Sequence, residues 1–124
     1  MQDEFNQGEY SMIFLGSDFQ YGWSRYRTAK SGNYNNVHRG AYSKEYAPSN
    51  EEIMFGKAIV DTYEATGYPV RNGRIDFIKA QTGPLLSEAE FINPMLLSCH
   101  DSRDEPYALR FAKYFIGQAN NQYE

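Results

Sequence analysis

The sequence has a single cysteine, no excess of positive charge and no long hydrophobic run, and each shortage excludes a class of protein. One cysteine, Cys99, excludes an intramolecular disulfide and suits a reducing compartment, so we expect a cytoplasmic protein. No run of about 18 apolar residues is present and no signal peptide precedes the chain, so neither membrane spanning nor secretion is expected. A formal net charge of −4 gives a nucleic-acid partner no electrostatic support.

Apolar and aromatic residues are present in the amount that one hydrophobic core needs. Hydrophobic residues make up 41% of the 124, and they include 11 tyrosines and 8 phenylalanines. A chain of this length can bury a core but is too short for two domains of usual size. We therefore expect a single domain over residues 1–124, with loose termini at 1–8 and 117–124.

The first half of the chain carries the signature of a β-hairpin. Residues 9–15 are mostly apolar and are predicted to form a buried strand, with residues 19–27 as its partner across Gly16-Ser17-Asp18. Residues 33–46 are expected to form an irregular connection with at most one short strand.

Two helices are expected. Ser49 is a good N-cap, Glu52 completes a capping box, and Gly67 ends the helix that they begin. A second helix over residues 105–116 is expected to bury one apolar stripe, made of Leu109, Phe111 or Ala112, and Phe115. The order ββαββα predicts an α+β fold, a mainly antiparallel sheet with two helices that cover it on one side.

Between the two helices the sequence predicts a second hairpin, which carries the most specific signal. The strands are expected over residues 73–78 and 85–94, with Gly83 in the turn at positive φ. If the hairpin is centred on Thr82, Asp76 lies opposite Glu88 and Arg74 lies opposite Glu90; a glycine bulge in the turn would slip this register by one residue. By alternation, Leu86, Glu88 and Glu90 are expected to share a face.

Like charges directly opposite each other destabilise a strand pair, so a cation between Asp76 and Glu88 is expected. Carboxylates without histidine or cysteine favour Mg²⁺ or Mn²⁺, and Mg²⁺ is commonly shared with nucleotide phosphates. Arg74 would then donate to phosphate oxygens. The alternative is an exposed hairpin in which Arg74 and Glu90 form a surface salt bridge worth about 0–1 kcal/mol.

This hairpin resembles the end of an ATP-grasp ligase. Arg-Ile-Asp, a short turn and Leu-Leu-Ser-Glu-Ala-Glu-Phe-Ile-Asn-Pro match the strands that bind MgATP in that superfamily. The resemblance implies ATP and Mg²⁺ (or Mn²⁺) as cofactors. It implies these roles by position: metal ligands Asp76, Glu88 and Glu90, a phosphate contact at Arg74, a contact with adenine or ribose at Leu86, and an amide nearby at Asn93. Glu90 departs from the commoner asparagine of the superfamily.

Residues 27–40 resemble a second segment of this superfamily, found in ribosomal-protein glutamate ligases. There a basic residue precedes Gly-Asp-Phe-Arg and Asn-x-His-Arg-Gly-Gly; here Arg27 matches the basic residue and Arg39 the second arginine. Both would offset charge on the transferred phosphoryl group. The arginine of Gly-Asp-Phe-Arg has no counterpart, because Asn35 follows Tyr34. Without the family, this composition indicates a loop.

The resemblance covers residues 9–116 and matches only the C-terminal half of an ATP-grasp enzyme. It implies the C-terminal part of an ATP-dependent carboxylate–amine ligase that holds the phosphates of MgATP for acyl-phosphate formation. The isolated chain is expected to be inactive, because one wall of the cleft is missing. The alternative is a non-catalytic association module with the same half-fold. Either form needs a partner, which is a missing N-terminal ligase half or a second copy of the chain.

Two other patterns have a simpler explanation. Cys99-His100-Asp101 resembles a nucleophile, base and orienting acid, but adjacent side chains rarely converge. Five aromatic residues offer a base-stacking platform as one interpretation, but they are more consistent with packing of the sheet. They are Tyr10, Tyr21, Trp23, Tyr26 and Tyr34.

Overall fold

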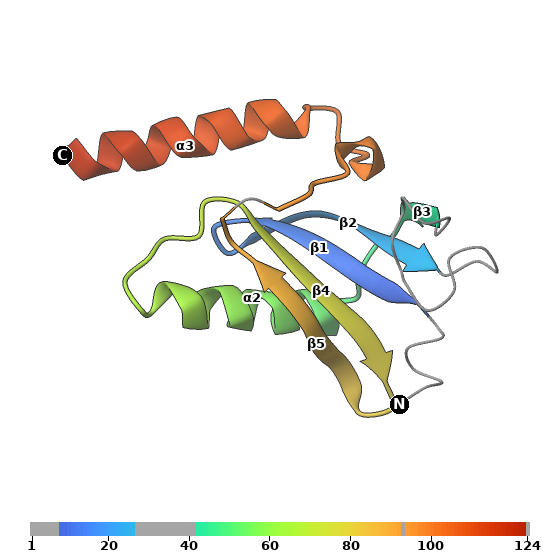
Figure 1. The fold of residues 1–124 in the computed structure, drawn as a ribbon. Helices are drawn as coiled ribbons and strands as arrows, with labels where there is room; N and C mark the ends of the chain where they lie inside the picture. The colour runs from blue at the N-terminus through green and yellow to red at the C-terminus, as the bar shows by residue number, and fades with distance from the viewer. Residues whose placement is uncertain (1–7, 27–41, 93, 124) are drawn as a thin grey trace.

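A computed structural model describes residues 8–26, 42–92 and 94–123 of the chain, and its α+β class is the one predicted (Figure 1). The element order is βββαββα, because a short strand, β3, joins the sheet from the segment expected to be irregular. In chain order the elements are β1 Glu9–Leu15, β2 Asp18–Tyr26, β3 Tyr42–Glu45, α2 Asn50–Glu64, β4 Gly73–Ala80, β5 Gly83–Glu90, the 3₁₀ turn η2 Ser98–His100, and α3 Tyr107–Tyr123.

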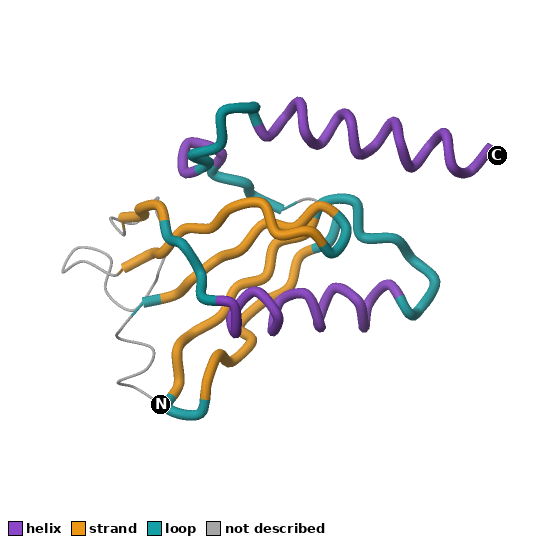
Figure 2. Tube along the Cα trace, turned by 180° about the vertical axis from the view of Figure 1, so that it is seen from behind, coloured by secondary structure: helices purple, strands orange, loops and turns teal. Residues whose placement is uncertain are grey.

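The five strands form one antiparallel sheet in the order β3-β2-β1-β4-β5 (Figure 2). β1 lies at the centre and pairs with β2 on one side and β4 on the other. The predicted first hairpin is confirmed to within one residue of its bounds. The central position of β1 follows from its composition, since a strand with six buried residues in seven needs neighbours on both edges.

Helix α2 covers one face of the sheet, and its capping box is the predicted one. The backbone N–H of Glu52 donates to Ser49 Oγ at 3.2 Å, and the backbone N–H of Ser49 donates to Glu52 Oε1 at 2.9 Å. Under the helix, a Cβ on Gly56 would lie 2.8 Å from side-chain carbons of Met12 and Phe14, so the helix approaches β1 closely only because this residue is glycine. The core on this face consists of Tyr10, Met12, Phe14, Val60, Val70, Ile75 and Phe77.

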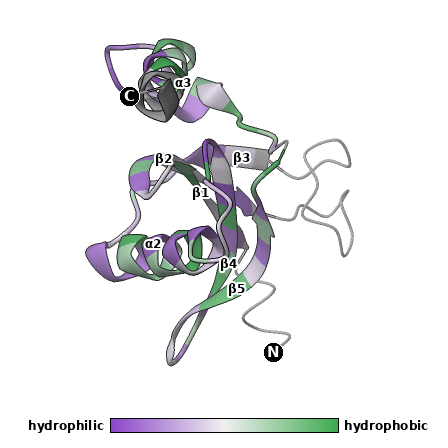
Figure 3. Cartoon of the chain, turned by 90° about the vertical axis from the view of Figure 1, so that its left-hand side faces the viewer, coloured by the Kyte–Doolittle hydropathy of each residue, from purple (hydrophilic) through white to green (hydrophobic). Residues whose placement is uncertain are grey.

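Helix α3 lies on the opposite face, so the expectation that both helices cover one side of the sheet is wrong (Figures 1 and 3). Its first turns pack over β1 and β2, where Tyr107 joins a second core cluster with Ile13, Leu15, Tyr21 and Trp23. This part of the second face, made of Ile13 and Leu15 on β1 with Tyr21 and Trp23 on β2, is apolar and therefore needs a cover of its own.

The buried stripe of α3 also differs from the predicted one. Tyr107 is 4% exposed, and Phe111 and Tyr114 pack against the same cluster, whereas Leu109 is 46% and Phe115 is 43% exposed. The stripe therefore follows positions 107, 111 and 114, and Leu109 falls on the other side of the helix. The helix begins after Pro106, whose carbonyl accepts from the N–H of Arg110 at 3.2 Å.

Candidate functional site

The face of the sheet opposite α2 carries a set of charged side chains that we call the charged face: Glu9, Arg25, Arg74, Asp76 and Glu88. Alternation along β4 explains its origin, since Ile75 and Phe77 point into the α2 core while Arg74 and Asp76 point away. These two are nevertheless buried, with Asp76 at 0% and Arg74 at 9% exposure. They are therefore not part of an ordinary solvated surface.

The register of the β4–β5 hairpin places Asp76 opposite Glu88 and Arg74 opposite Glu90, as predicted. This register does not arise from a hairpin centred on Thr82, as predicted, but from a shorter turn combined with a bulge in β5. The turn has two residues between the paired Ala80 and Gly83, and Gly83 has the expected positive φ, +124°. One unpaired residue, Ser87, then shifts the register between the partners of Phe77 and Asp76. Without that bulge, Asp76 would face Ser87.

The bulge corrects the prediction for Leu86. Leu86 pairs with Phe77, whose side chain lies in the core on the α2 side of the sheet. It therefore does not share a face with Glu88 and Glu90. The side chain is 49% exposed, at the outer edge of the sheet. No local sequence pattern predicts this change, because the bulge residue is a serine rather than a glycine.

Asp76 is held by three side chains from three strands. Ser11 Oγ on β1 donates to Asp76 Oδ1 at 2.6 Å, and Arg74 Nε donates to Oδ1 at 3.0 Å and to Oδ2 at 3.2 Å. Arg25 on β2 brings Nη2 to 3.6 Å from Oδ2. The arrangement satisfies the requirement that a buried carboxylate be paired and hydrogen-bonded.

Arg74 connects the two opposed carboxylates. Its Nη2 lies 3.7 Å from Glu88 Oε2, and its Nη1 donates to the carbonyl oxygen of Met95 at 3.4 Å. Both acids therefore lie within reach of one cationic group, as the register implied. The expectation that only a divalent ion could relieve their crowding is wrong, because the guanidinium groups of Arg74 and Arg25 do so. Among the described residues, no group of three or more His, Cys, Asp or Glu side chains could hold a metal ion.

Glu9 is the residue of this face that sequence reasoning missed. It forms an ion pair with Arg25, and Ser87 Oγ donates to Glu9 Oε2 at 2.7 Å. Burial raises the pKa of the Glu9 carboxyl; Arg25 and the Ser87 hydrogen bond oppose this, and the charges of Asp76 and Glu88 add to it. The signal was available: the β1–β2 hairpin pairs Glu9 with Arg25, and Glu9 shares the face of Ser11.

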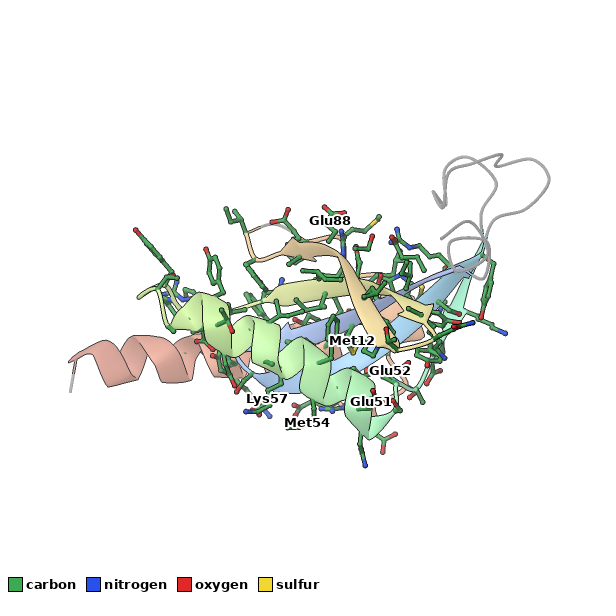
Figure 4. The ribbon with its side chains drawn as sticks, turned by 90° about the horizontal axis from the view of Figure 1, so that it is seen from below. Met12, Glu51, Glu52, Met54, Lys57 and Glu88 are labelled. Atoms are coloured by element: carbon green, nitrogen blue, oxygen red, sulfur yellow. The ribbon has the colours of Figure 1, made fainter. Side chains whose placement is uncertain are left out.

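Glu90 completes the described part of the predicted site. It lies opposite Arg74 in the register, and its Oε1 accepts from the backbone N–H of Ile92 at 2.9 Å. Figure 4 labels Glu88 on this hairpin, apart from Glu51 and Lys57 on α2. The remaining predicted site residues, Arg27, Arg39 and Asn93, lie outside the residues that the structure describes.

The Cys99-His100-Asp101 sequence does not form a catalytic arrangement. His100 Nε2 lies 2.8 Å from Ser43 Oγ, and Asp101 Oδ2 accepts from Arg110 Nη1 at 2.9 Å, so the two side chains serve different partners. The aromatic residues are likewise divided between the faces of the sheet. Tyr10 packs in the α2 core and Trp23 in the α3 cluster, which is the arrangement of packing residues and not of a shared platform.

Comparison with known proteins supports the fold. No protein-family model and no curated protein matches the sequence. The fold is similar to that of ATP-grasp enzymes of known structure. One is the D-cycloserine synthetase DcsG, with a TM-score of 0.71 and 16% identity over 94% of this chain. Another is the D-alanine–D-alanine ligase from Bacillus anthracis, with a TM-score of 0.51 and 14% identity over 86% of this chain.

The chain spans only part of these enzymes, 40% of the synthetase and 34% of the ligase. The similarity therefore bears on the half-fold that carries the charged face. Within the described residues, no helix is both long and apolar enough to cross a membrane.

Proposed function

We propose that this chain is the C-terminal ATP-grasp part of an ATP-dependent carboxylate–amine ligase, and that its charged face holds the phosphates of MgATP. The observation that carries the proposal is the approach of Asp76 and Glu88, from neighbouring strands, to the guanidinium group of Arg74. The fold supports it, since both comparison enzymes are named for joining or synthesising small amino-acid products.

The donor set of the charged face fits a magnesium ion that is shared with phosphates. The three acids proposed as ligands, Asp76 and Glu88 of the charged face and Glu90 farther along β5, offer only oxygen, the donor that Mg²⁺ and Mn²⁺ prefer. Mg²⁺ is usually held by one or two carboxylates together with substrate phosphates, and not by a full protein cage. Since no group of three or more acids that could hold a metal occurs among the described residues, one or two of these carboxylates would hold the ion together with the phosphates.

In this proposal the arginines exchange partners when nucleotide binds. The Arg74 guanidinium, now on Asp76 and Glu88, turns to phosphate oxygens and leaves the carboxylates free for the ion. Arg27 and Arg39 join it in offsetting charge on the γ-phosphoryl group, and Asn93 supplies an amide nearby. A bound Mg²⁺ would neutralise phosphate charge.

In a ligase of this kind, the substrate carboxylate takes the γ-phosphoryl group from ATP to give an acyl phosphate and ADP. An amine then attacks the acyl carbon, an amide forms and phosphate leaves. The present chain supplies only one wall of the site, so we expect it to bind nucleotide without turnover. We place the protein in the cytoplasm, where both ATP and a free cysteine fit.

Glu88 offers the sharpest test, because its side chain is 61% exposed and its replacement should leave the fold intact. Isothermal titration with MgATP should give a binding heat for the wild type. It should give binding at least about ten-fold weaker for Glu88→Gln, in line with loss of one charged ligand. Asp61→Asn, which removes an exposed acid of α2, is the matched control and should bind as the wild type does. No heat at millimolar MgATP, or equal binding by both variants, would refute the proposal.

The second candidate is a non-catalytic association module. It is favoured by large apolar side chains that the chain leaves exposed, among them Ile92 at 89% and Ile116 at 58%. In this case the chain would form a homodimer or bind an N-terminal half on another chain. A concentration-dependent dimer in analytical ultracentrifugation, together with no heat from MgATP, would select the module over the ligase part.

A further inference from the structure

A cavity of about 630 Å³ lies where the end of α2, the start of β4, the end of β5 and helix α3 come together. Its size is within the range of about 300–1,000 Å³ that small-molecule sites occupy. Its walls are formed by four aromatic residues, two other apolar residues, and Arg71 and Asn72; the apolar and aromatic ones are Tyr63, Tyr68, Pro69, Phe91, Ile92 and Phe111. None of these residues belongs to the charged face.

Arg71 differs from the other described arginines in having no anionic or carbonyl partner within residues 8–26, 42–92 and 94–123. Its guanidinium carbon lies 5.0 Å from the centre of the Phe115 ring, and its Nε is buried without a hydrogen bond. The carboxylate of Glu64, at the end of α2, accepts instead from the backbone N–H of Val70 at 3.3 Å. The two Nη groups of Arg71 are not buried in this way and have no hydrogen bond to a described residue, so they are the donors that an anion from outside the chain could bind.

The other polar group of the cavity is also set to donate. Asn72 accepts a hydrogen bond from the Tyr107 hydroxyl through Oδ1, so the group that its side chain still offers is the amide NH₂. The cavity therefore presents hydrogen-bond donors from Arg71 and Asn72 against aromatic walls. Donors without a matching acceptor select a ligand that carries negative charge.

The cavity continues into an apolar groove along α2. This groove, of about 510 Å³, shares Tyr63 and Phe91 with the cavity and extends to Phe55 and Ile59. By itself the groove has no charged group that would orient a ligand. Together the two provide a cationic end and an apolar arm, which is the usual composition of a site for an amphiphilic small molecule.

We propose that this cavity is a binding site for a small organic carboxylate with an aromatic or aliphatic body. The carboxylate would take two hydrogen bonds from the Arg71 fork, with Asn72 as a further donor. The body would lie between Tyr63 and Phe91 and extend into the apolar groove. This site does not depend on nucleotide binding at the charged face.

Chemical-shift perturbation in the full-length chain tests the proposal, with phenylbutyrate as the probe and its neutral amide, phenylbutyramide, as the comparison. The acid should shift backbone amide signals of Tyr63, Arg71 and Phe91, and the amide should bind at least about ten-fold more weakly, because it lacks the charge-assisted hydrogen bonds. This comparison needs no variant and is therefore independent of any effect on folding.

Arg71→Gln then tests the assigned cation. It should lower the affinity for phenylbutyrate at least about ten-fold and leave the affinity for the amide unchanged. Lys57→Gln is the matched control, since it removes an exposed positive charge that pairs with Asp61 on α2, and it should bind as the wild type does. Equal binding of acid and amide, unchanged binding in Arg71→Gln, or shifts that are absent or lie elsewhere would each overturn the proposal.

Discussion

The two faces of the central sheet are built from the same strands but follow different physical rules. On β4, Ile75 and Phe77 lie in the buried apolar layer under α2. The alternating residues Arg74 and Asp76 lie on the opposite face, where they are buried among charged side chains. The apolar layer needs only hydrophobic side chains of suitable volume. The charged face needs each partner in place, because a buried charge is tolerated only when it is paired.

The difference indicates what each face contributes. Burial of apolar area is the main favourable term in folding, whereas a buried ion pair often does no better than well-packed apolar residues of similar size. The ion pairs of the charged face therefore add little net stability, although each requires its side chains to be placed accurately; they join Glu9, Arg25, Asp76 and Arg74. This imbalance is what a binding face on a stable scaffold would have.

The largest effect is expected on the apolar face. Phe77→Ala should lower the free energy of unfolding by about 3–5 kcal/mol, because Phe77 is fully buried and the change leaves a cavity. Urea unfolding followed by the fluorescence of Trp23, which is itself buried, measures the loss. Phe115→Ala is the control, since that ring is 43% exposed, and it should cost less than about 1 kcal/mol. Similar losses for both variants would mean that the α2 layer is not the main core.

On the charged face, removal of one partner should be costly and removal of both should not. Asp76→Leu leaves Arg74 buried without its carboxylate and should cost about 3–5 kcal/mol. Adding Arg74→Met should recover most of that loss, because an apolar pair replaces an ion pair. A double-mutant cycle by urea unfolding provides the measurement. If the two losses simply add, Asp76 and Arg74 stabilise the fold independently of each other, and the contrast between the faces fails.

The fold was predictable wherever local chemistry decided it. Ser49 and Glu52 identify the start of α2, and the apolar run of residues 9–15 before Gly16-Ser17-Asp18 identifies the first hairpin. Each of these rests on residues close in sequence. The α+β class also follows from the order of elements.

The rest depended on long-range packing. Nothing near Ser87 predicts that a bulge there compensates for a short turn, although this sets the face of Leu86. The side of the sheet that α3 covers, and its buried stripe at Tyr107, depend on the second apolar cluster. The role of Arg25 beside Asp76 likewise required the β2–β1–β4 order, which the sequence alone does not give.

A smaller effect is expected at the edge of the apolar layer, where α2 begins. Ser49→Ala removes the side-chain acceptor for the N–H of Glu52 and should cost about 1 kcal/mol in urea unfolding. Ser102→Ala, at an exposed position outside helices and strands, is the control and should be neutral. An equal effect at both positions would show that the cap does not anchor the helix over the sheet.

The smallest effect is a pH dependence confined to the charged face. Burial raises the pKa of the Glu9 carboxyl above its usual value of 4.5. Between 4.5 and this raised pKa, the folded chain binds more protons than the unfolded chain does. The protonated Glu9 therefore stabilises the fold at low pH, and this contribution is lost as the pH rises through the folded-state pKa. The sign is opposite to that of a carboxylate whose charged form the fold favours.

Urea unfolding of the wild type and of Glu9→Gln at a series of pH values isolates this term. Relative to the variant, the wild type should gain stability as the pH is lowered to about 4.5, because only the wild type takes up the proton at residue 9. Asp61→Asn, on the exposed side of α2, controls for a general change in charge. Parallel pH profiles for the wild type and Glu9→Gln would mean that the Arg25 and Ser87 contacts cancel the effect of burial on the Glu9 pKa. The partners of Glu9 on the charged face would then fully compensate for the burial of its carboxylate.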